Sequence, residues 1–169
     1  MVAPIKISEA YGGGGFLQSG SLPPSLWRHD FIELYNPTDA AVDLDGWSVQ
    51  YGSAGRNSGA ITSGKILLTG SIPARGHYLV QATGDSAGGG SPLPAPDAAA
   101  TSNVFMSASS GFVHLTNTTD TLAPPTGDIA GLSGLVDAVG YGTANTSEFE
   151  PTGTTLGGVL SAQRTTPGI

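Results

Sequence analysis

The chain has 169 residues, of which 38% are hydrophobic and only 11% are charged, and its formal net charge is −7. It contains no cysteine, which excludes disulfides, thiolate metal sites and cysteine nucleophiles. The six lysines and arginines are scattered and form no basic stripe, so the composition argues against nucleic-acid binding and against polybasic membrane attachment. No apolar run approaches the roughly 20 residues of a membrane-spanning helix, so we expect no membrane insertion.

Short strands are predicted from the N-terminus onward. Residues 4–10 alternate apolar and polar side chains, and the glycines that follow end that strand. A second strand is predicted over residues 30–36, where Asn36 before Pro37 favours a turn. Residues 40–51 predict a hairpin, because Asp45-Gly46 can supply a two-residue turn between alternating segments.

The pattern continues to the C-terminus. Two strands are predicted within residues 65–81, a hairpin within 103–117, one strand at 134–142 and a last one at 158–164. The connections over residues 83–101 and 120–133 are long and rich in glycine, proline or both. About nine short strands without helical periodicity predict an all-β fold, a sandwich or a barrel. Without a repeat or an internal boundary, we expect one domain over residues 1–169, excised from a longer protein.

One serine lies in the G-x-S-x-G pattern of hydrolase nucleophiles, formed by Gly84, Ser86 and Gly88. That pattern requires a helix after the serine, but Ala-Gly-Gly-Gly-Ser-Pro follows and cannot begin a stable one. A base is also required, and the three histidines are interpreted as a loop residue, His29, and two exposed strand positions, His77 and His114. We therefore predict no catalytic residue, and interpret the glycines near Ser86 as flexibility at a loop tip.

Carboxylates are the remaining candidates for metal binding. Glu9 and Asp30 flank the first long loop and are the best candidates for calcium, although strand-end carboxylates that face solvent give the same pattern. No other cofactor is predicted. Asp137 lies inside a predicted strand and, if it is buried, should accept backbone hydrogen bonds from a loop. Trp27, in a proline-rich loop, is the aromatic residue best placed to stack on a sugar.

The segment DFIELYNPTDAAVDLDGWSVQY, residues 30–51, resembles the signature segment of lamin tail domains of the exported bacterial type. IKISEAYGGGG resembles the opening strand and glycine loop of that family, and the later predicted strands follow in the expected order. The resemblance implies an immunoglobulin-like β-sandwich without catalytic residues. It also implies structural roles for five residues: Asn36 and Pro37 in a turn, Asp45 and Gly46 in the hairpin, and Trp47 in the core.

The resemblance implies a function outside catalysis. We expect a monomeric interaction or adhesion module of a secreted or cell-surface bacterial protein, with a protein or polysaccharide partner. The alternative is an accessory module that targets carbohydrate or DNA for an attached secreted hydrolase, such as a nuclease or a phosphatase. An exposed aromatic strip would favour sugar binding, whereas a local basic patch with steep salt dependence would favour DNA.

Overall fold

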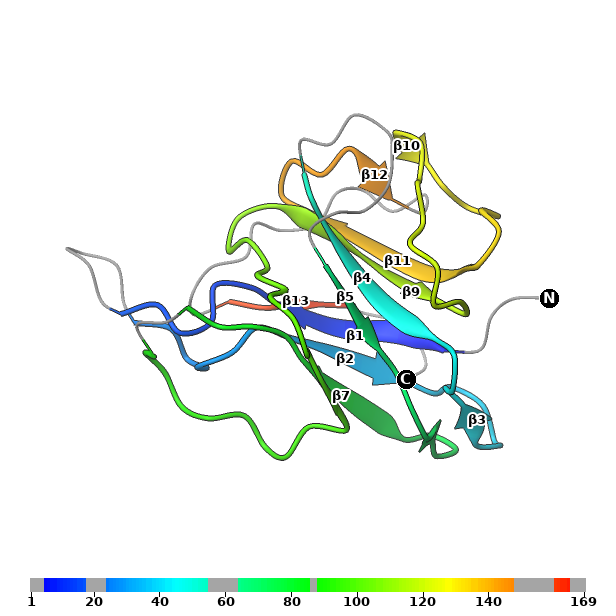
Figure 1. Ribbon diagram of the computed structural model, residues 1–169, viewed down its shortest axis with the longest axis horizontal. Helices are drawn as coiled ribbons and strands as arrows, with labels where there is room; N and C mark the ends of the chain where they lie inside the picture. The colour runs from blue at the N-terminus through cyan, green and yellow to red at the C-terminus, as the bar shows by residue number, and fades with distance from the viewer. Residues whose placement is uncertain (1–4, 18–23, 55–63, 86–87, 148–159, 165–169) are drawn as a thin grey trace.

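The computed structural model describes residues 5–17, 24–54, 64–85, 88–147 and 160–164. All the regular secondary structure in these ranges is β-strand, and two main sheets face each other as the layers of a sandwich (Figure 1). The all-β prediction is therefore confirmed. Among the same residues, no helix is long and apolar enough to cross a membrane.

The larger sheet has five strands. In spatial order these are β13 (Ala162–Gln163), β1 (Lys6–Tyr11), β2 (Phe31–Tyr35), β7 (His77–Gln81) and β8 (Ala98–Ala99). The strands pair antiparallel except β7 and β8, which are parallel. A bulge in β1 between Ile7 and Glu9 shifts its register against β2.

The facing sheet has four antiparallel strands. In spatial order these are β11 (Leu135–Tyr141), β9 (Gly111–Thr116), β4 (Ser48–Ser53) and β5 (Lys65–Leu67). Two further pairs lie outside the main sheets: β3 (Val42–Asp43) with β6 (Ser71–Ile72), and β10 (Gly127–Asp128) with β12 (Thr146–Ser147).

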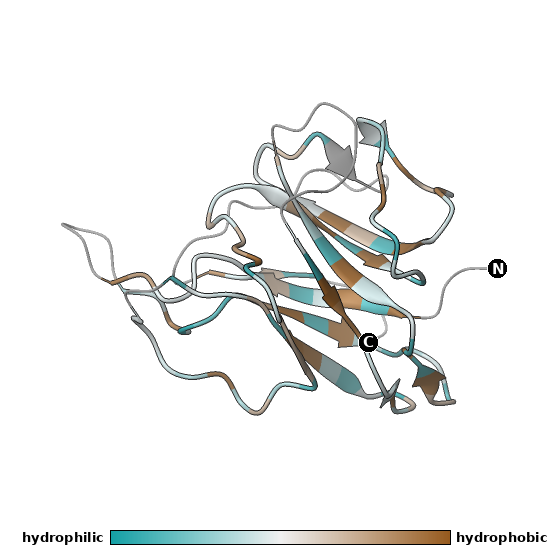
Figure 2. Cartoon of the chain, viewed as in Figure 1, coloured by the Kyte–Doolittle hydropathy of each residue, from teal (hydrophilic) through white to brown (hydrophobic). Residues whose placement is uncertain are grey.

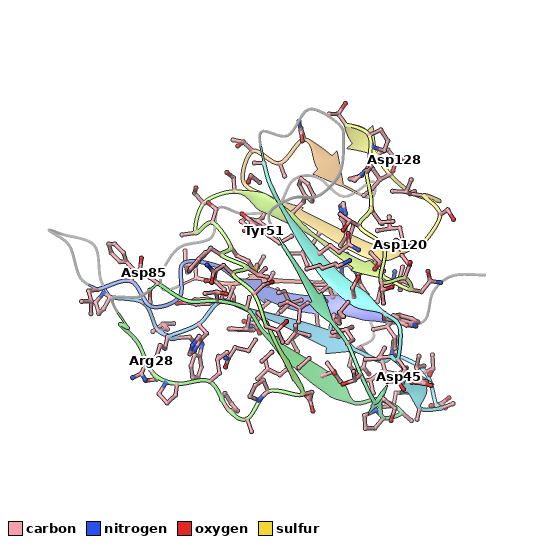
Figure 3. All side chains as sticks on the ribbon, in the orientation of Figure 1. Arg28, Asp45, Tyr51, Asp85, Asp120 and Asp128 are labelled. Carbon is pink, nitrogen blue, oxygen red and sulfur yellow. The ribbon has the colours of Figure 1, made fainter. Side chains whose placement is uncertain are left out.

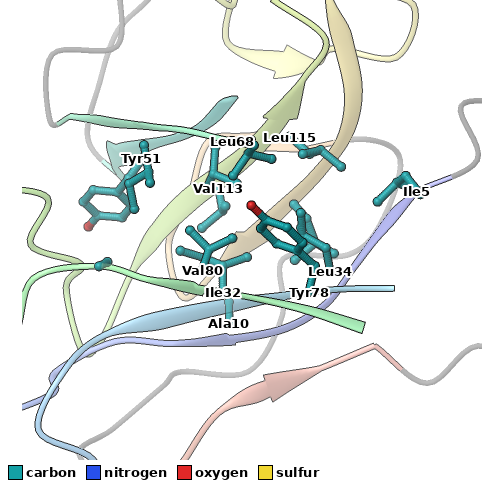
Figure 4. Close-up of a cluster of buried hydrophobic side chains, with 14 of the residues drawn as sticks. Ile5, Ala10, Ile32, Leu34, Tyr51, Leu68, Tyr78, Val80, Val113 and Leu115 are labelled. Carbon is teal, nitrogen blue, oxygen red and sulfur yellow. The ribbon is translucent and has the colours of Figure 1, made fainter. Parts of the chain in front are cut away.

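Strand alternation places the core between the two layers, as the alternating colours of the strands in Figure 2 illustrate. Ile32 and Leu34 of β2 are fully buried and meet Val113 and Leu115 of β9, which are also fully buried (Figure 4). Tyr51 of β4 lies in the same cluster. Ile32 and Leu34 alternate in the sequence with Phe31, Glu33 and Tyr35, and this alternation predicts which side chains of β2 form the core.

The four-stranded sheet is also covered on its outer face, over β4 and β9. The Gln50 amide donates to the Asp120 carbonyl at 2.7 Å and accepts from the Leu122 amide at 2.9 Å. Ser48 and Thr116 each donate to the Thr118 carbonyl, at 2.8 and 2.9 Å. These buried polar side chains hold the connection after β9 against the sheet, so every residue of β9 is buried.

The hairpin predicted over residues 40–51 is not formed. Asp45-Gly46 does make a turn, in which the Trp47 amide donates to the Leu44 carbonyl at 3.0 Å. However, β3 pairs with β6, whereas β4 pairs with β5 and β9. The turn therefore passes the chain from one sheet to another. The hairpin predicted within 103–117 is wrong for the same reason, because β9 pairs with β4 and β11.

The signature residues lie at this end of the sandwich. The buried Asn36 amide donates to the carbonyls of Ala40 and Pro73 at 2.8 and 2.9 Å, and its oxygen accepts from the Thr38 amide at 3.0 Å. It therefore fixes the turn that begins at Pro37.

The other signature residues hold the neighbouring turn. The Asp45 carboxylate accepts from the Gly70 amide at 2.7 Å, and Gly46 has a φ of 81°. Trp47 is half-buried and packs against the edge of the core.

Candidate functional site

The end of the sandwich opposite these turns gathers segments that are far apart in the sequence. We call it the loop end and define it as residues 12–17, 24–30, 83–85, 88–91 and 102–107; it extends to the left in Figure 1. Its segments pair through the backbone, with bridges between Gly15 and Gly89 and between Trp27 and Ser91. The Gly15 amide donates to the Trp27 carbonyl at 2.9 Å, and the Arg28 amide donates to the Ser91 carbonyl at 2.8 Å.

Glycines in the loop end permit close contact between backbones. A Cβ atom on Gly84 would lie 1.9 Å from the Arg28 carbonyl oxygen, and one on Gly14 would lie 2.3 Å from the His29 carbonyl carbon. Neither position has room for a side chain, because the obstructing atoms belong to a backbone that other hydrogen bonds hold. The interpretation of the glycines near Ser86 as flexibility at a loop tip is therefore wrong for Gly84. Ser86 itself lies outside the described residues.

Gly84→Ala is expected to lower the free energy of unfolding by about 1–3 kcal/mol, the range of other overpacking substitutions. The new methyl group would force the segments at Gly84 and Arg28 apart. Denaturant unfolding measures the change, with Gly88→Ala as control, because a Cβ at Gly88 meets nothing within 4 Å and only its φ of 71° is unfavourable. A Gly84→Ala variant as stable as the wild type would contradict the close contact.

Asp30 joins the glycine loop to the segment before β9. Its side chain is buried, and its two oxygens accept from the amides of Gly14 and Met106 at 2.6 and 2.7 Å. Burial raises the pKa of Asp30 to about 7, while backbone hydrogen bonds from Gly14, Met106 and Gly13 act to lower it. The carboxyl group therefore holds two other backbone segments, the glycine loop and the segment before β9, against its own.

The two calcium candidates are not brought together. Glu9 pairs across the strands with Glu33 of β2, and Glu33 lies three residues along the chain from Asp30, or about 10 Å at the usual rise of a strand. Both oxygens of Asp30 already accept backbone hydrogen bonds. Within the described ranges, no three histidine, aspartate or glutamate side chains are grouped so that they could hold a metal ion.

The loop end presents apolar side chains to solvent. Leu17, Leu26 and Phe105 are 53%, 54% and 51% exposed, and Trp27 beside Leu26 is half-buried. Arg28, labelled in Figure 3, is also exposed. Sequence reasoning identified Trp27 but missed Phe105, because Phe105 lies in a segment that was predicted to be a strand of a hairpin. The exposed aromatic side chain at this end is therefore Phe105.

Asp137 is the second buried carboxylate, and it links the two sheets at β1 and β11. It accepts from the Ile7 amide at 2.7 Å and forms ion pairs with Lys6 at 3.1 Å and Arg164 at 2.7 Å. The sequence predicted that a buried Asp137 would accept a backbone hydrogen bond, and it does, although the donor is a strand and not a loop. No pattern in the sequence indicated the two cations.

The histidines do not form a common site in the described part of the chain. His77 has a half-exposed side chain whose Nδ1 lies 3.0 Å from Glu33 Oε1. His114 is fully buried, so the prediction that it is an exposed strand position is wrong. Its burial lowers its pKa to about 4. Neither ring nitrogen of His114 has a hydrogen-bond partner among the described residues.

Comparison with protein families gives one match. Residues 2–143 match the family model of the Lamin Tail Domain. Comparison with curated proteins and with solved structures gave no match. Domains of this family are immunoglobulin-like and not enzymatic, which agrees with the two facing sheets and the all-β composition. The chain belongs to the lamin tail domain family, as a β-sandwich of the immunoglobulin-like type.

Proposed function

We propose that this chain is an interaction module of a secreted or cell-surface protein, without catalytic activity of its own, and that it binds its partner through the loop end. The observation that carries the proposal is the exposure of Leu17, Leu26 and Phe105 at one end of the sandwich. Loops held by a rigid scaffold are where binding residues are concentrated in such folds.

The fixed backbone beneath these side chains favours binding. Leu26 and Arg28 flank Trp27 on a segment whose backbone is bonded to Gly15 on one side and to Ser91 on the other. A surface that is ordered before binding loses less conformational entropy when its partner docks. When a partner buries Leu17, Leu26 and Phe105, each Å² of apolar surface removed from water contributes roughly 25 cal/mol to the free energy of binding.

A polysaccharide is the partner class that one observation favours over others. Phe105 offers a half-exposed ring, Trp27 is half-buried, and Arg28 is an exposed donor at the same end. Aromatic faces pack against the apolar faces of sugars, and a guanidinium group donates to hydroxyl or carboxylate oxygens. The alternative role, as a module that targets carbohydrate for an attached hydrolase, uses the same surface. A DNA-targeting role has weaker support, because Arg28 is the single lysine or arginine among the residues of the loop end and the net charge of the chain is −7.

The test is a binding screen with glycans, proteins and DNA, run with and without calcium, followed by variants against each ligand found. We expect the double variant Leu26→Ser, Phe105→Ser to lose at least about tenfold in affinity, as for other central apolar contacts. Leu67→Ser is the matched control, because Leu67 is 53% exposed on β5 in the facing sheet. Binding that weakens in the control and persists in the double variant would overturn the proposal.

A further inference from the structure

The outer edge of β1 is filled by the last described part of the chain. Residues Ala162 and Gln163 of β13 pair antiparallel with Ala10 and Glu9, and the Arg164 amide donates to the Ser8 carbonyl at 2.9 Å. These contacts are backbone pairing along a short stretch. They are the same contacts that an added strand makes when a peptide extends a sheet.

A specificity contact lies beside this pairing. Nη1 of Arg164 donates to Asp137 Oδ2 at 2.7 Å, and Nη2 donates to the Ala138 carbonyl at 3.2 Å. The Asp137 side chain is 1% exposed and that of Arg164 is 13% exposed. A planar guanidinium can reach a carboxylate and a carbonyl with separate N–H groups, whereas an ammonium is a single point donor. The edge therefore selects an arginine at one position of the added strand.

The β1 edge with Asp137 accepts the added strand, and the family match covers this acceptor but not the strand itself. The family match over residues 2–143 includes the β1 edge and Asp137, but it ends before residues 162–164. Without Arg164, the buried Asp137 carboxylate would rely on the Lys6 ammonium and the Ile7 amide. A buried carboxylate that loses its paired cation is strongly disfavoured. Binding of an arginine at this site therefore stabilises the Asp137 carboxylate.

We propose that the β1 edge and Asp137 form a strand-addition site for an extended, arginine-bearing peptide segment of another chain. Residues 162–164 occupy the site in cis and compete with that partner. This inference concerns a different surface from the loop end and does not depend on it. A tethered segment acts at an effective concentration of about millimolar, so the wild-type chain binds a partner weakly until the cis segment is displaced.

The experiment uses the full chain with Arg164→Gln, which removes the guanidinium from the cis segment and leaves the acceptor unchanged. The probe is a fluorescent peptide with the sequence of residues 159–166, VLSAQRTT. We expect it to bind the variant at least about tenfold more tightly than it binds the wild-type chain. The same peptide carrying Arg164→Gln is the matched control and should show no such gain. Amide shifts of Ser8, Glu9 and Ala10 locate the bound peptide.

Three results would overturn the proposal. The first is an Arg164→Gln chain that stays unfolded even in excess of the arginine-bearing peptide, because a segment supplied by another chain would then not replace residues 162–164. The second is a folded variant that binds neither peptide. The third is equal affinity of the variant for both peptides, which would show that Asp137 does not select the arginine.

Discussion

Replacing His114 with leucine is expected to stabilise the protein in acid by about 3 kcal/mol, because a buried histidine must otherwise become charged. Burial lowers the pKa of His114 in the folded protein to about 4, from an ordinary value of 6.5. As the pH falls below 6.5, the unfolded chain binds a proton that the folded chain does not. His114 therefore costs the wild type stability between pH 6.5 and 4, at about 1.4 kcal/mol for each pH unit.

The surroundings of His114 support this expectation. The ring stacks on Phe112 with centroids 4.8 Å apart, and its strand neighbours are Gln50 and Ala138. Phe112, Gln50 and Ala138 carry no negative charge, so none of them can stabilise a protonated His114 as a carboxylate would. Leucine fills a similar volume without polar atoms, so its packing cost should be small.

The measurement is denaturant unfolding at pH 4.5 and pH 7.5 for the wild type and His114→Leu. The difference between the two proteins should be large at pH 4.5 and small at pH 7.5. His77→Leu is the control, since the side chain of His77 is 52% exposed. A difference of the same size at both pH values would show that protonation of His114 is not responsible.

Asp30→Asn is expected to destabilise the protein most strongly at low pH. The folded pKa of about 7 lies above the ordinary 3.8, so the folded state takes up a proton between these values. Asp30 therefore contributes stability that is fully present below pH 4 and is lost as the pH rises through 7, by up to about 4 kcal/mol. Asparagine removes this contribution. Its NH₂ group would also face the amide of Gly14 or Met106, and an unsatisfied buried donor costs about 1–3 kcal/mol.

The two groups oppose each other between pH 4 and 6.5. His114 makes the wild type more stable as the pH rises, whereas Asp30 makes it less stable, so the two slopes largely cancel. Unfolding measured across this range should show stability that falls with pH in His114→Leu and rises with pH in Asp30→Asn. Asp128→Asn, at an exposed carboxylate, is the control for the second variant and should keep the wild-type profile. If His114→Leu and Asp30→Asn both kept the wild-type dependence of stability on pH, the proposed pH linkage would be contradicted.

Strand faces could be predicted from the sequence, but strand partners could not. Alternation places Ile32 and Leu34 on one face of their strand, because side chains of a strand point to opposite sides in turn, and the structure buries that face in the core. The same local signal does not say which strand lies alongside. Asp45-Gly46 was therefore identified correctly as a turn and assigned wrongly to a hairpin, since β3 and β4 pair with different strands.

The loop end was harder to predict because its features depend on contacts between distant segments. Gly84 packs against Arg28, which is 56 residues away in the sequence, so its role could not be found from neighbouring residues. Asp30 was singled out as a calcium candidate with Glu9, but its oxygens accept from the amides of Gly14 and Met106. His114 looked exposed because polar residues on a strand usually face solvent, whereas here a polar network holds a connection over that face.

Amide hydrogen exchange at the loop end tests most directly whether this module presents a binding surface that is ordered before its partner arrives. The amides of Gly15, Arg28, Gly89 and Ser91 each donate to a backbone carbonyl within the loop end. We predict that they exchange at least about a hundredfold more slowly than amides of an unstructured chain, as expected for stably bonded backbone. Exchange of these four amides at the unstructured rate would show a loop end that is not preformed and would contradict the account.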